Sequence, residues 1–284
     1  MYPSTVSFDA FTEDTFSARR LPDRVHYRMV RCNTCGLVRS DPVADAELHA
    51  NLYRGGGFGA ADETDNMAQT YGRYLARLDG YDAVKGQLLE VGCATGFMLE
   101  QALAQGYAQV SGVEPSEVMV AAASPAVAPH IVCDIMRPDL FPPEIFDVVC
   151  MFQTFDHLAE PVAMLNECRR VLRPGGLILL LNHNVAAPFA RLLGERSPII
   201  DLQHTYLYNK DTIRRVLDQC GFTTLETGDV RNDYTLRYLG HLAPLPGLLK
   251  TVSNAILAAT PLGKLPLSLP LGNLYAIARK PGAE

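Results

Sequence analysis

From residue 87 onward, short apolar segments alternate with segments of helical periodicity. The segments expected to form strands are 88–91, 110–113, 130–133, 146–152, 177–181, 222–227 and 274–279. The segments expected to form helices are 97–103, 117–123, 161–172 and 212–219, the last ended by Gly221. Strands and helices that alternate at these lengths form a mostly parallel sheet with helices on both faces. The chain is therefore predicted to be an α/β protein.

The regions on either side of this pattern differ from it. Residues 1–66 show little periodicity and contain many turn-forming residues, so they are predicted to form a small irregular N-terminal region. Helical spacing of apolar residues begins near Met67 and opens the main domain, 67–284. Within that domain, the segment 232–271 is rich in Leu, Pro and Gly and poor in charge. It is predicted to be an insertion that caps the binding site or forms a homodimer contact.

Composition narrows the class of protein. The chain has 284 residues, 48% hydrophobic and 20% charged, with a net charge of −6. This is an ordinary globular composition, and it excludes a global basic surface for nucleic acid. No stretch approaches the roughly 18 apolar residues of a membrane span. Residues 1–20 carry three acids and lack the apolar core of a signal peptide. With seven scattered cysteines, the chain is expected to be cytoplasmic.

The segment 88–97, Leu-Leu-Glu-Val-Gly-Cys-Ala-Thr-Gly-Phe, is the most informative part of the sequence. A buried strand enters a loop with Gly92 and Gly96, and the loop opens a helix. Glycine allows positive φ and close approach of a ligand to the backbone, and the first amides of a helix favour an anionic group. Glu114 ends the next strand, where an acid can bind the hydroxyls of an adenosine ribose. A nucleotide-like cofactor is predicted.

A dinucleotide fits this loop poorly. In the G-x-G-x-x-G fingerprint, Ala94 and Phe97 stand at the second and third glycine positions, where side chains crowd a pyrophosphate. An NAD-dependent enzyme is therefore disfavoured.

The spacing Glu90-x-Gly92-x-x-x-Gly96 instead resembles motif I of the class I S-adenosylmethionine (SAM)-dependent methyltransferases. Further segments resemble the same family over about 68–280: Val132-Cys133-Asp134-Ile135, 146–153, Phe155-Asp156-His157-Leu158 and Leu172-Arg173-Pro174-Gly175-Gly176. The resemblance implies a Rossmann-like sheet of seven strands, the last antiparallel, with SAM over the carboxyl ends of the first and fourth strands. The implied cofactor residues are Glu90, Gly92, Cys93, Ala94, Thr95, Gly96, Phe97, Glu114, Pro115, Ser116, Asp134, Ile135, Met151, Phe152 and Gln153. For Met151 and Phe152, plain core packing is an equal alternative.

Methyl transfer to a hydroxyl benefits from a general base, and histidine suits neutral pH. His204, His157 and His183, in that order, are the candidates, and each has the alternative of being an ordinary hydrogen-bonded loop residue. Asn182, Asn184 and Tyr206 are candidate contacts to the acceptor.

Cys32 and Cys35 have the spacing of half a zinc knuckle, and their segment resembles half of the N-terminal zinc ribbon of some sugar and natural-product methyltransferases. A structural zinc needs four ligands, and no second pair exists, so we predict a degenerate knuckle without metal; His26 is the one further candidate ligand. The surrounding arginines form either a solvated face or a patch for a phosphate-bearing or carrier-bound acceptor: Arg19, Arg20, Arg24, Arg28, Arg31 and Arg39.

These features predict a SAM-dependent methyltransferase that acts on a small molecule of sugar or natural-product type. The expected acceptor atom is a hydroxyl oxygen, attacked by in-line displacement with a histidine base. The alternative is a methyltransferase-fold protein that no longer catalyses and serves in binding or assembly.

Overall fold

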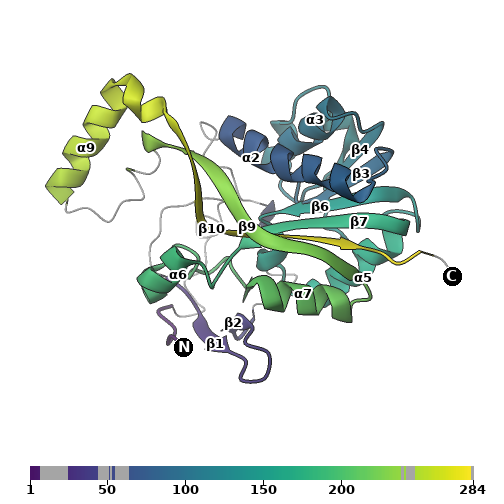
Figure 1. The fold of residues 1–284 in the computed structure, drawn as a ribbon, viewed down its shortest axis with the longest axis horizontal. Helices are drawn as coiled ribbons and strands as arrows, with labels where there is room; N and C mark the ends of the chain where they lie inside the picture. Colours follow the sequence, from purple (N-terminus) through teal and green to yellow (C-terminus); the bar gives the residue numbers. More distant parts are fainter. Residues whose placement is uncertain are drawn as a thin grey trace.

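The computed structural model describes residues 1–6, 25–43, 51, 53–54, 64–237, 240 and 247–282. A central sheet is covered by helices on both faces, and a long two-stranded arm with a helix at its tip leaves the sheet at one side (Figure 1). The α/β class predicted from the sequence is confirmed.

The central sheet has seven strands in the order β5-β4-β3-β6-β7-β10-β9. Their bounds are Gln87–Val91 for β3, Gln109–Val113 for β4, Ile131–Val132 for β5, Phe146–Phe152 for β6, Leu172–His183 for β7, Thr223–Thr235 for β9 and Pro266–Arg279 for β10. Strands β5, β4, β3, β6 and β7 pair in parallel, whereas β10 is antiparallel to both of its neighbours. The predicted seven-stranded sheet with an antiparallel last strand is confirmed.

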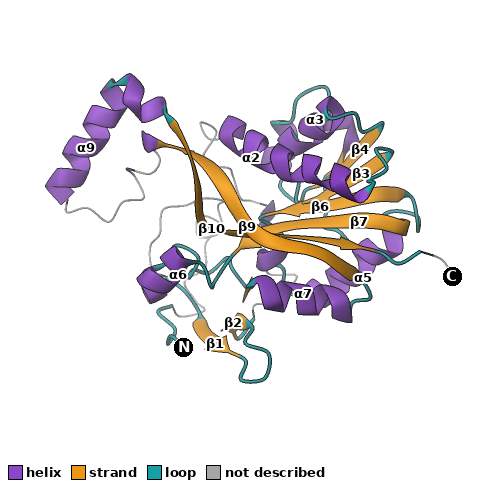
Figure 2. Cartoon of the chain, in the orientation of Figure 1, coloured by secondary structure: helices purple, strands orange, loops and turns teal. Residues whose placement is uncertain are grey.

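Two helical layers bury the two faces of this sheet (Figure 2). The α-helices of the described chain are α2 Thr64–Ala76, α3 Phe97–Ala104, α4 Glu117–Ala121, α5 Pro161–Val171, α6 Pro188–Leu193, α7 Lys210–Gln219 and α9 Gly247–Ala259. Of these, α9 lies at the tip of the arm, away from the sheet faces (Figure 1). Alternate residues of β6 divide between two cores: Cys150 packs with apolar residues of α2 and α3, and Val149 packs with those of α5 and α7. Because parallel strands are buried on both faces, β6 has no exposed residue at all.

The turn expected at 173–176 lies within β7. Pairing with β6 passes from Leu172 directly to Leu177, so the intervening residues bulge out of the ladder, and Gly175 has φ +81°. Along the chain, α7 begins with a capping box in which the Asn209 side chain accepts from the Thr212 amide at 2.8 Å. This cap satisfies amides that otherwise lack a partner at a helix start.

The segment 232–271 differs from the expected insertion. Its first residues continue β9 and its last residues belong to β10, so Asn232 pairs with Leu269 and Thr235 with Pro266. The strands expected over 222–227 and 274–279 are therefore too short. Antiparallel partners satisfy each other's backbone groups, which lets the pair extend beyond the sheet as an arm. Residues 238–239 and 241–246 lie outside the described part of the chain.

The N-terminal region contributes a separate small sheet. Strands β1 Arg28–Arg31 and β2 Val38–Asp41 form a hairpin, and β2 also pairs with β8 Tyr206–Leu207. Met29 and Val38 are fully buried in a cluster with Leu207. The boundary expected at residue 66 stays a prediction. No helix in the described ranges has the length and apolar character needed to cross a membrane.

Candidate functional site

The glycine loop after β3 is tightly packed. Gly92 and Gly96 have φ values of +76° and +77°, and Ala94 between them has φ +49°. A Cβ added to Gly96 would lie 2.8 Å from Cγ2 of Val127, and one added to Gly92 would collide with the Thr154 side chain. Both positions therefore need glycine for backbone conformation and for space.

Glu114 at the end of β4 is bound to this loop. Its Oε2 accepts from the amide of Ala94 at 2.9 Å and its Oε1 accepts from the amide of Ser116 at 2.9 Å. Burial raises the pKa of Glu114, and the two amide hydrogen bonds oppose that rise. The carboxyl group thus has a fixed orientation with lone pairs still available to a ligand.

Glu90 lies on β3 just before the loop and is 2% exposed. Its Oε2 has no hydrogen-bond partner among the residues that the structure describes. Burial, followed by the nearby Glu114, raises the pKa of Glu90 well above its usual value. An unpartnered buried carboxyl oxygen is costly. Glu90 therefore suits a ligand group that donates hydrogen bonds or carries positive charge.

The residues predicted to bind the cofactor gather at the carboxyl ends of four strands that are neighbours in the sheet, β5, β4, β3 and β6. In order they are Glu90, Gly92, Cys93, Ala94, Thr95, Gly96 and Phe97 after β3; Glu114, Pro115 and Ser116 after β4; Asp134 and Ile135 after β5; and Met151, Phe152 and Gln153 at β6. Their assignment to the cofactor stays a prediction.

Several of these side chains have structural roles. Cys93 and Met151 are fully buried, and the Phe152 ring stacks on Tyr71 with centroids 5.0 Å apart. Gln153 has φ +53°, and its buried Oε1 has no hydrogen-bond partner within the described ranges. Gln153, directly after β6, thus has a side-chain oxygen available to a ligand.

Asp134 is engaged by its neighbours after β5. It accepts from the Ile135 amide at 2.8 Å and from Nε of Arg137 at 3.0 Å. Desolvation raises the pKa of Asp134, but these hydrogen bonds outweigh it and the pKa lies below the usual value.

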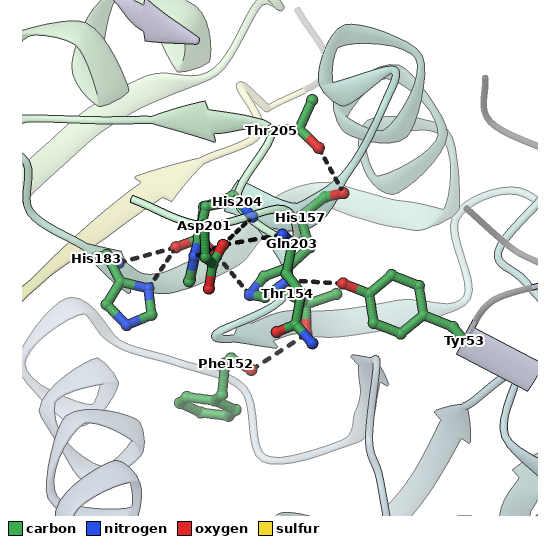
Figure 3. A network of polar contacts seen from close by, with 10 residues as sticks. Tyr53, Phe152, Thr154, His157, His183, Asp201, Gln203, His204 and Thr205 are labelled. Atoms are coloured by element: carbon green, nitrogen blue, oxygen red, sulfur yellow. Dashed lines mark hydrogen bonds and ion pairs between the residues drawn. The ribbon is translucent and has the colours of Figure 1, made fainter. Parts of the chain in front are cut away.

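The three histidines expected from the sequence come together (Figure 3). The ring centroid of His204 lies 4.5 Å from that of His157 and 4.4 Å from that of His183. His157 follows β6, His183 ends β7, and His204 lies in the loop before β8. Thr154 belongs to the same segment as His157 and also packs against the Gly92 position, so this cluster lies beside the glycine loop.

Asp156 links two of these histidines. It is fully buried, and its Oδ2 accepts from the His183 amide at 3.1 Å and pairs with Nδ1 of the same residue at 2.8 Å. Its Oδ1 lies 3.8 Å from Nε2 of His157. Burial alone would raise the pKa of Asp156, but the His183 hydrogen bond and the surrounding histidines hold it well below the usual range.

The other two histidines are each held at Nδ1. In His204 this atom lies 2.7 Å from Oδ1 of Asp201, which also accepts from the amides of Gln203 and His204. In His157 it lies 2.8 Å from the Tyr53 hydroxyl. Burial, and next the nearby His204, lower the pKa of His157 to about 3, so its ring is neutral at pH 7.

Sequence reasoning missed the partners of these histidines. Asp156 adjoins His157, and Asp201 precedes His204 by three positions, so both acids carry a local signal. Tyr53 carries none, because it comes from the irregular N-terminal region. Among the candidate acceptor contacts, Asn184 donates to Oδ1 of Asp229 at 3.0 Å and Asn182 is fully buried.

The cysteine pair lies on the β1–β2 hairpin. The Gly36 amide donates to the Cys32 carbonyl at 2.9 Å, and neither Cys32 nor Cys35 forms a disulfide. Hydrogen bonds from the backbone of Cys35 and Thr34 lower the pKa of Cys32 to about 7. His26 instead pairs with Glu195, at 3.3 Å. Arg28 and Arg39 pair with Asp41, whereas Arg19, Arg20 and Arg24 lie outside the described residues.

A family model described as a methyltransferase domain matches residues 64–227, more than half of the chain. The chain belongs to this family and is a class I SAM-dependent methyltransferase. The match spans β3 to β7 and the glycine loop, and it includes His157, His183 and His204.

Curated relatives carry the name ubiquinone biosynthesis O-methyltransferase. The protein from Bradyrhizobium sp. (strain ORS 278) is 36% identical over 104 residues, which is 34% of this chain and 41% of that protein. The protein from Pseudomonas aeruginosa (strain LESB58) is 30% identical over 118 residues, 38% of this chain and 50% of that protein. The methyltransferase thus spans half or less of the length of these relatives.

Solved structures of SAM-dependent methyltransferases are also similar. The protein from Archaeoglobus fulgidus has a TM-score of 0.48 at 18% identity and covers 75% of this chain and 94% of its own. Phosphoethanolamine N-methyltransferase 2 from Haemonchus contortus, solved with SAM, has a TM-score of 0.47 at 20% identity. The match covers 74% of this chain and 53% of that protein.

Proposed function

We propose that the methyltransferase transfers the SAM methyl group to a hydroxyl oxygen of a small-molecule acceptor, and that His183 accepts the hydroxyl proton. The observation that carries the proposal is the pairing of the buried Asp156 with the partly exposed His183 beside the glycine loop. The relatives named as O-methyltransferases support oxygen as the acceptor atom. The sequence ranks His204 first as the base. Exposure favours His183, whose side chain is 25% exposed against 7% for His204.

The cofactor half of the site would use the glycine loop and two acids. The positive-φ turn at Gly92 and Gly96 admits a ligand close to the backbone. Glu114, fixed by two amides, would bind the ribose hydroxyls, and Glu90, with its unpartnered oxygen, would face the amino group of the methionine moiety. Bound SAM supplies a methyl group activated by its attachment to a sulfonium.

The protein's part in the transfer is to position the acceptor and receive a proton. Because Asp156 binds Nδ1 of His183, the Nε2 atom is left as the acceptor nitrogen. As the hydroxyl oxygen forms its bond to the methyl carbon, its proton passes to Nε2 and the carbon–sulfur electron pair stays on sulfur. The buried Asp156 carboxylate then stabilises the imidazolium.

The cofactor assignment predicts how binding of S-adenosylhomocysteine responds to substitution. Glu114→Ala removes charge-assisted hydrogen bonds and should weaken binding about 10- to 100-fold. Gly96→Val should abolish binding, because its side chain meets Val127 and φ is positive. Isothermal titration calorimetry measures both, with the exposed Asp211→Ala on α7 as control. Unchanged affinity in both variants would contradict the assignment of the cofactor pocket to this loop.

The base assignment predicts a second result. His183→Ala should lower kcat about 100- to 10,000-fold while leaving the affinity for S-adenosylhomocysteine intact. The measurement is S-adenosylhomocysteine release with a panel of hydroxylated acceptors, and His130→Ala, an exposed histidine on η5 (Ala128–His130), is the matched control. Full activity in His183→Ala refutes the base. If the unmodified protein releases S-adenosylhomocysteine with none of the acceptors in the panel, the non-catalytic alternative is favoured.

A further inference from the structure

We propose that Asp156, His157 and His204 form a binding site for one divalent first-row transition-metal ion beside the glycine loop. Each residue offers one ligand atom, and these atoms all lie within 4.8 Å of one another. Over the ranges the structure describes, no other group of three histidine, cysteine or acidic side chains meets this condition. The cluster is also shielded from solvent, since Asp156 is fully buried and the His157 side chain is 16% exposed.

Each of the three ligands is oriented by a partner of its own. Tyr53 holds Nδ1 of His157 at 2.8 Å, and Asp201 holds Nδ1 of His204 at 2.7 Å. A histidine fixed at Nδ1 presents Nε2 to a metal, and such partners are the usual support of metal-binding histidines.

Asp156 is arranged in the same way. Its Oδ2 binds His183, while its buried Oδ1 has no hydrogen-bond partner in the described part of the chain. A buried carboxylate oxygen without a donor is costly, and a cation bound between Asp156 and the two Nε2 atoms would satisfy it.

The donor set selects the class of ion. Two neutral imidazoles and one carboxylate suit Zn²⁺, Fe²⁺, Co²⁺ or Ni²⁺, whereas Mg²⁺ and Ca²⁺ prefer oxygen ligands. Bonds to zinc are about 2.0–2.2 Å long, so an ion would draw the three side chains closer together than they lie here. Three protein ligands leave coordination positions open, as in catalytic metal sites.

The open positions would bind acceptor oxygens. This step alone rests on the proposed function. An acceptor with two neighbouring hydroxyl groups could occupy two positions and place one oxygen for attack, with His183 as the proton acceptor next to the ion. The metal site itself requires no catalysis and can be tested by binding.

The test is titration of the chelator-treated full chain with Co²⁺, followed by visible absorption and calorimetry. We expect one ion to bind per chain. His204→Ala and His157→Ala should abolish binding, and His130→Ala should leave it unchanged. Asp201→Asn keeps all three ligands and should weaken binding about 10- to 100-fold. Mg²⁺ should not compete.

Titration of every variant with S-adenosylhomocysteine reports whether its fold and cofactor pocket are intact. Binding of that ligand without any binding of Co²⁺ overturns the metal site and leaves the proposed function standing. Co²⁺ binding that survives His204→Ala, or that disappears in the Cys32→Ser/Cys35→Ser double variant, also overturns it. If the alanine variants do not fold, Asp201→Asn decides, because full Co²⁺ affinity in that variant contradicts the geometry.

Discussion

Single residues set the charge state of the groups beside them, and the partly buried Glu226 on β9 shows this outside the functional site. Its carboxylate accepts from Nη2 of Arg77 at 2.5 Å, from the Tyr81 hydroxyl at 2.7 Å and from the Tyr275 hydroxyl at 2.5 Å. The Arg77 hydrogen bond is the largest of the effects that lower the pKa of Glu226 to about 2, from an ordinary value of 4.5. These bonds tie the short helix η4 (Arg77–Tyr81), which directly follows α2, to β9 and β10.

Because the pKa is lowered in the folded state, the ionised Glu226 stabilises the fold above its ordinary pKa, and this contribution is lost as pH falls towards about 2. Glu226→Gln should therefore lower the free energy of unfolding at pH 7 and differ progressively less from the unmodified protein as pH falls from 4.5 to 2. Urea unfolding across this range measures it. Glu160→Gln, at an exposed acid, should show little effect, and a pH-independent difference would contradict the interpretation.

At the scale of elements, the N-terminal hairpin supports the histidine cluster. The Ser40 amide of β2 donates to the Thr205 carbonyl at 2.9 Å, and the Thr205 amide donates to the Asp156 carbonyl at 2.9 Å. Together with the pairing of β2 and β8, these bonds connect the hairpin to the segment that carries Asp201 and His204. The hairpin therefore supports the site indirectly, by holding the segment that carries Asp201 and His204 in place.

Removing the core of this hairpin should affect turnover more than cofactor binding. Met29→Ala empties a fully buried position and should cost about 2–5 kcal/mol of stability. We expect slower methyl transfer because Asp201 and His204 lose support, with unchanged S-adenosylhomocysteine affinity because the glycine loop packs in a different core. Urea unfolding and acceptor turnover measure the two effects. Val84→Ala, at an exposed position, is the control, and normal turnover in Met29→Ala would contradict the support role.

Elements with a local hydrophobic signal could be predicted from the sequence. Strand β6 is an unbroken apolar run apart from Asp147, and its predicted bounds are confirmed. The outer half of β9, from Asp229 to Thr235, is mostly polar and, apart from the buried Val230 and Asn232, at least partly exposed. Its strand conformation comes from pairing with β10, a partner far along the chain, and no local pattern reports such pairing.

In the candidate site, too, features with a local sequence signal could be predicted and those set by distant segments could not. The glycine loop and Glu114 were predictable because strand, loop and acid follow one another at a fixed spacing. The histidines were predictable as residues, but two of their contacts were not, since Tyr53 meets His157 and Asp156 meets His183 from distant segments. Asp201, by contrast, lies three positions before His204. Only the folded sheet shows which nitrogen of each ring is held.

At the scale of the whole molecule, the sheet places the predicted cofactor residues and the histidine cluster at the ends of different strands. The strands β5, β4, β3 and β6 end at the predicted cofactor residues, while β6 and β7 lead into the histidine cluster. The β6 end is common to both, because Thr154, three residues before His157, packs against the Gly92 position. The proposed donor and acceptor sites thus share the end of β6, which suits a direct transfer between them.

The position of β10 has a consequence for how the chain assembles. This strand follows both of its neighbours along the chain yet lies between β7 and β9 in the sheet, so each of them has an unpaired edge until β10 has been synthesised. Such edges are templates for pairing between chains. The yield of refolding should therefore depend on how fast β10 inserts between β7 and β9. Crowded nascent chains should aggregate most readily just before that insertion.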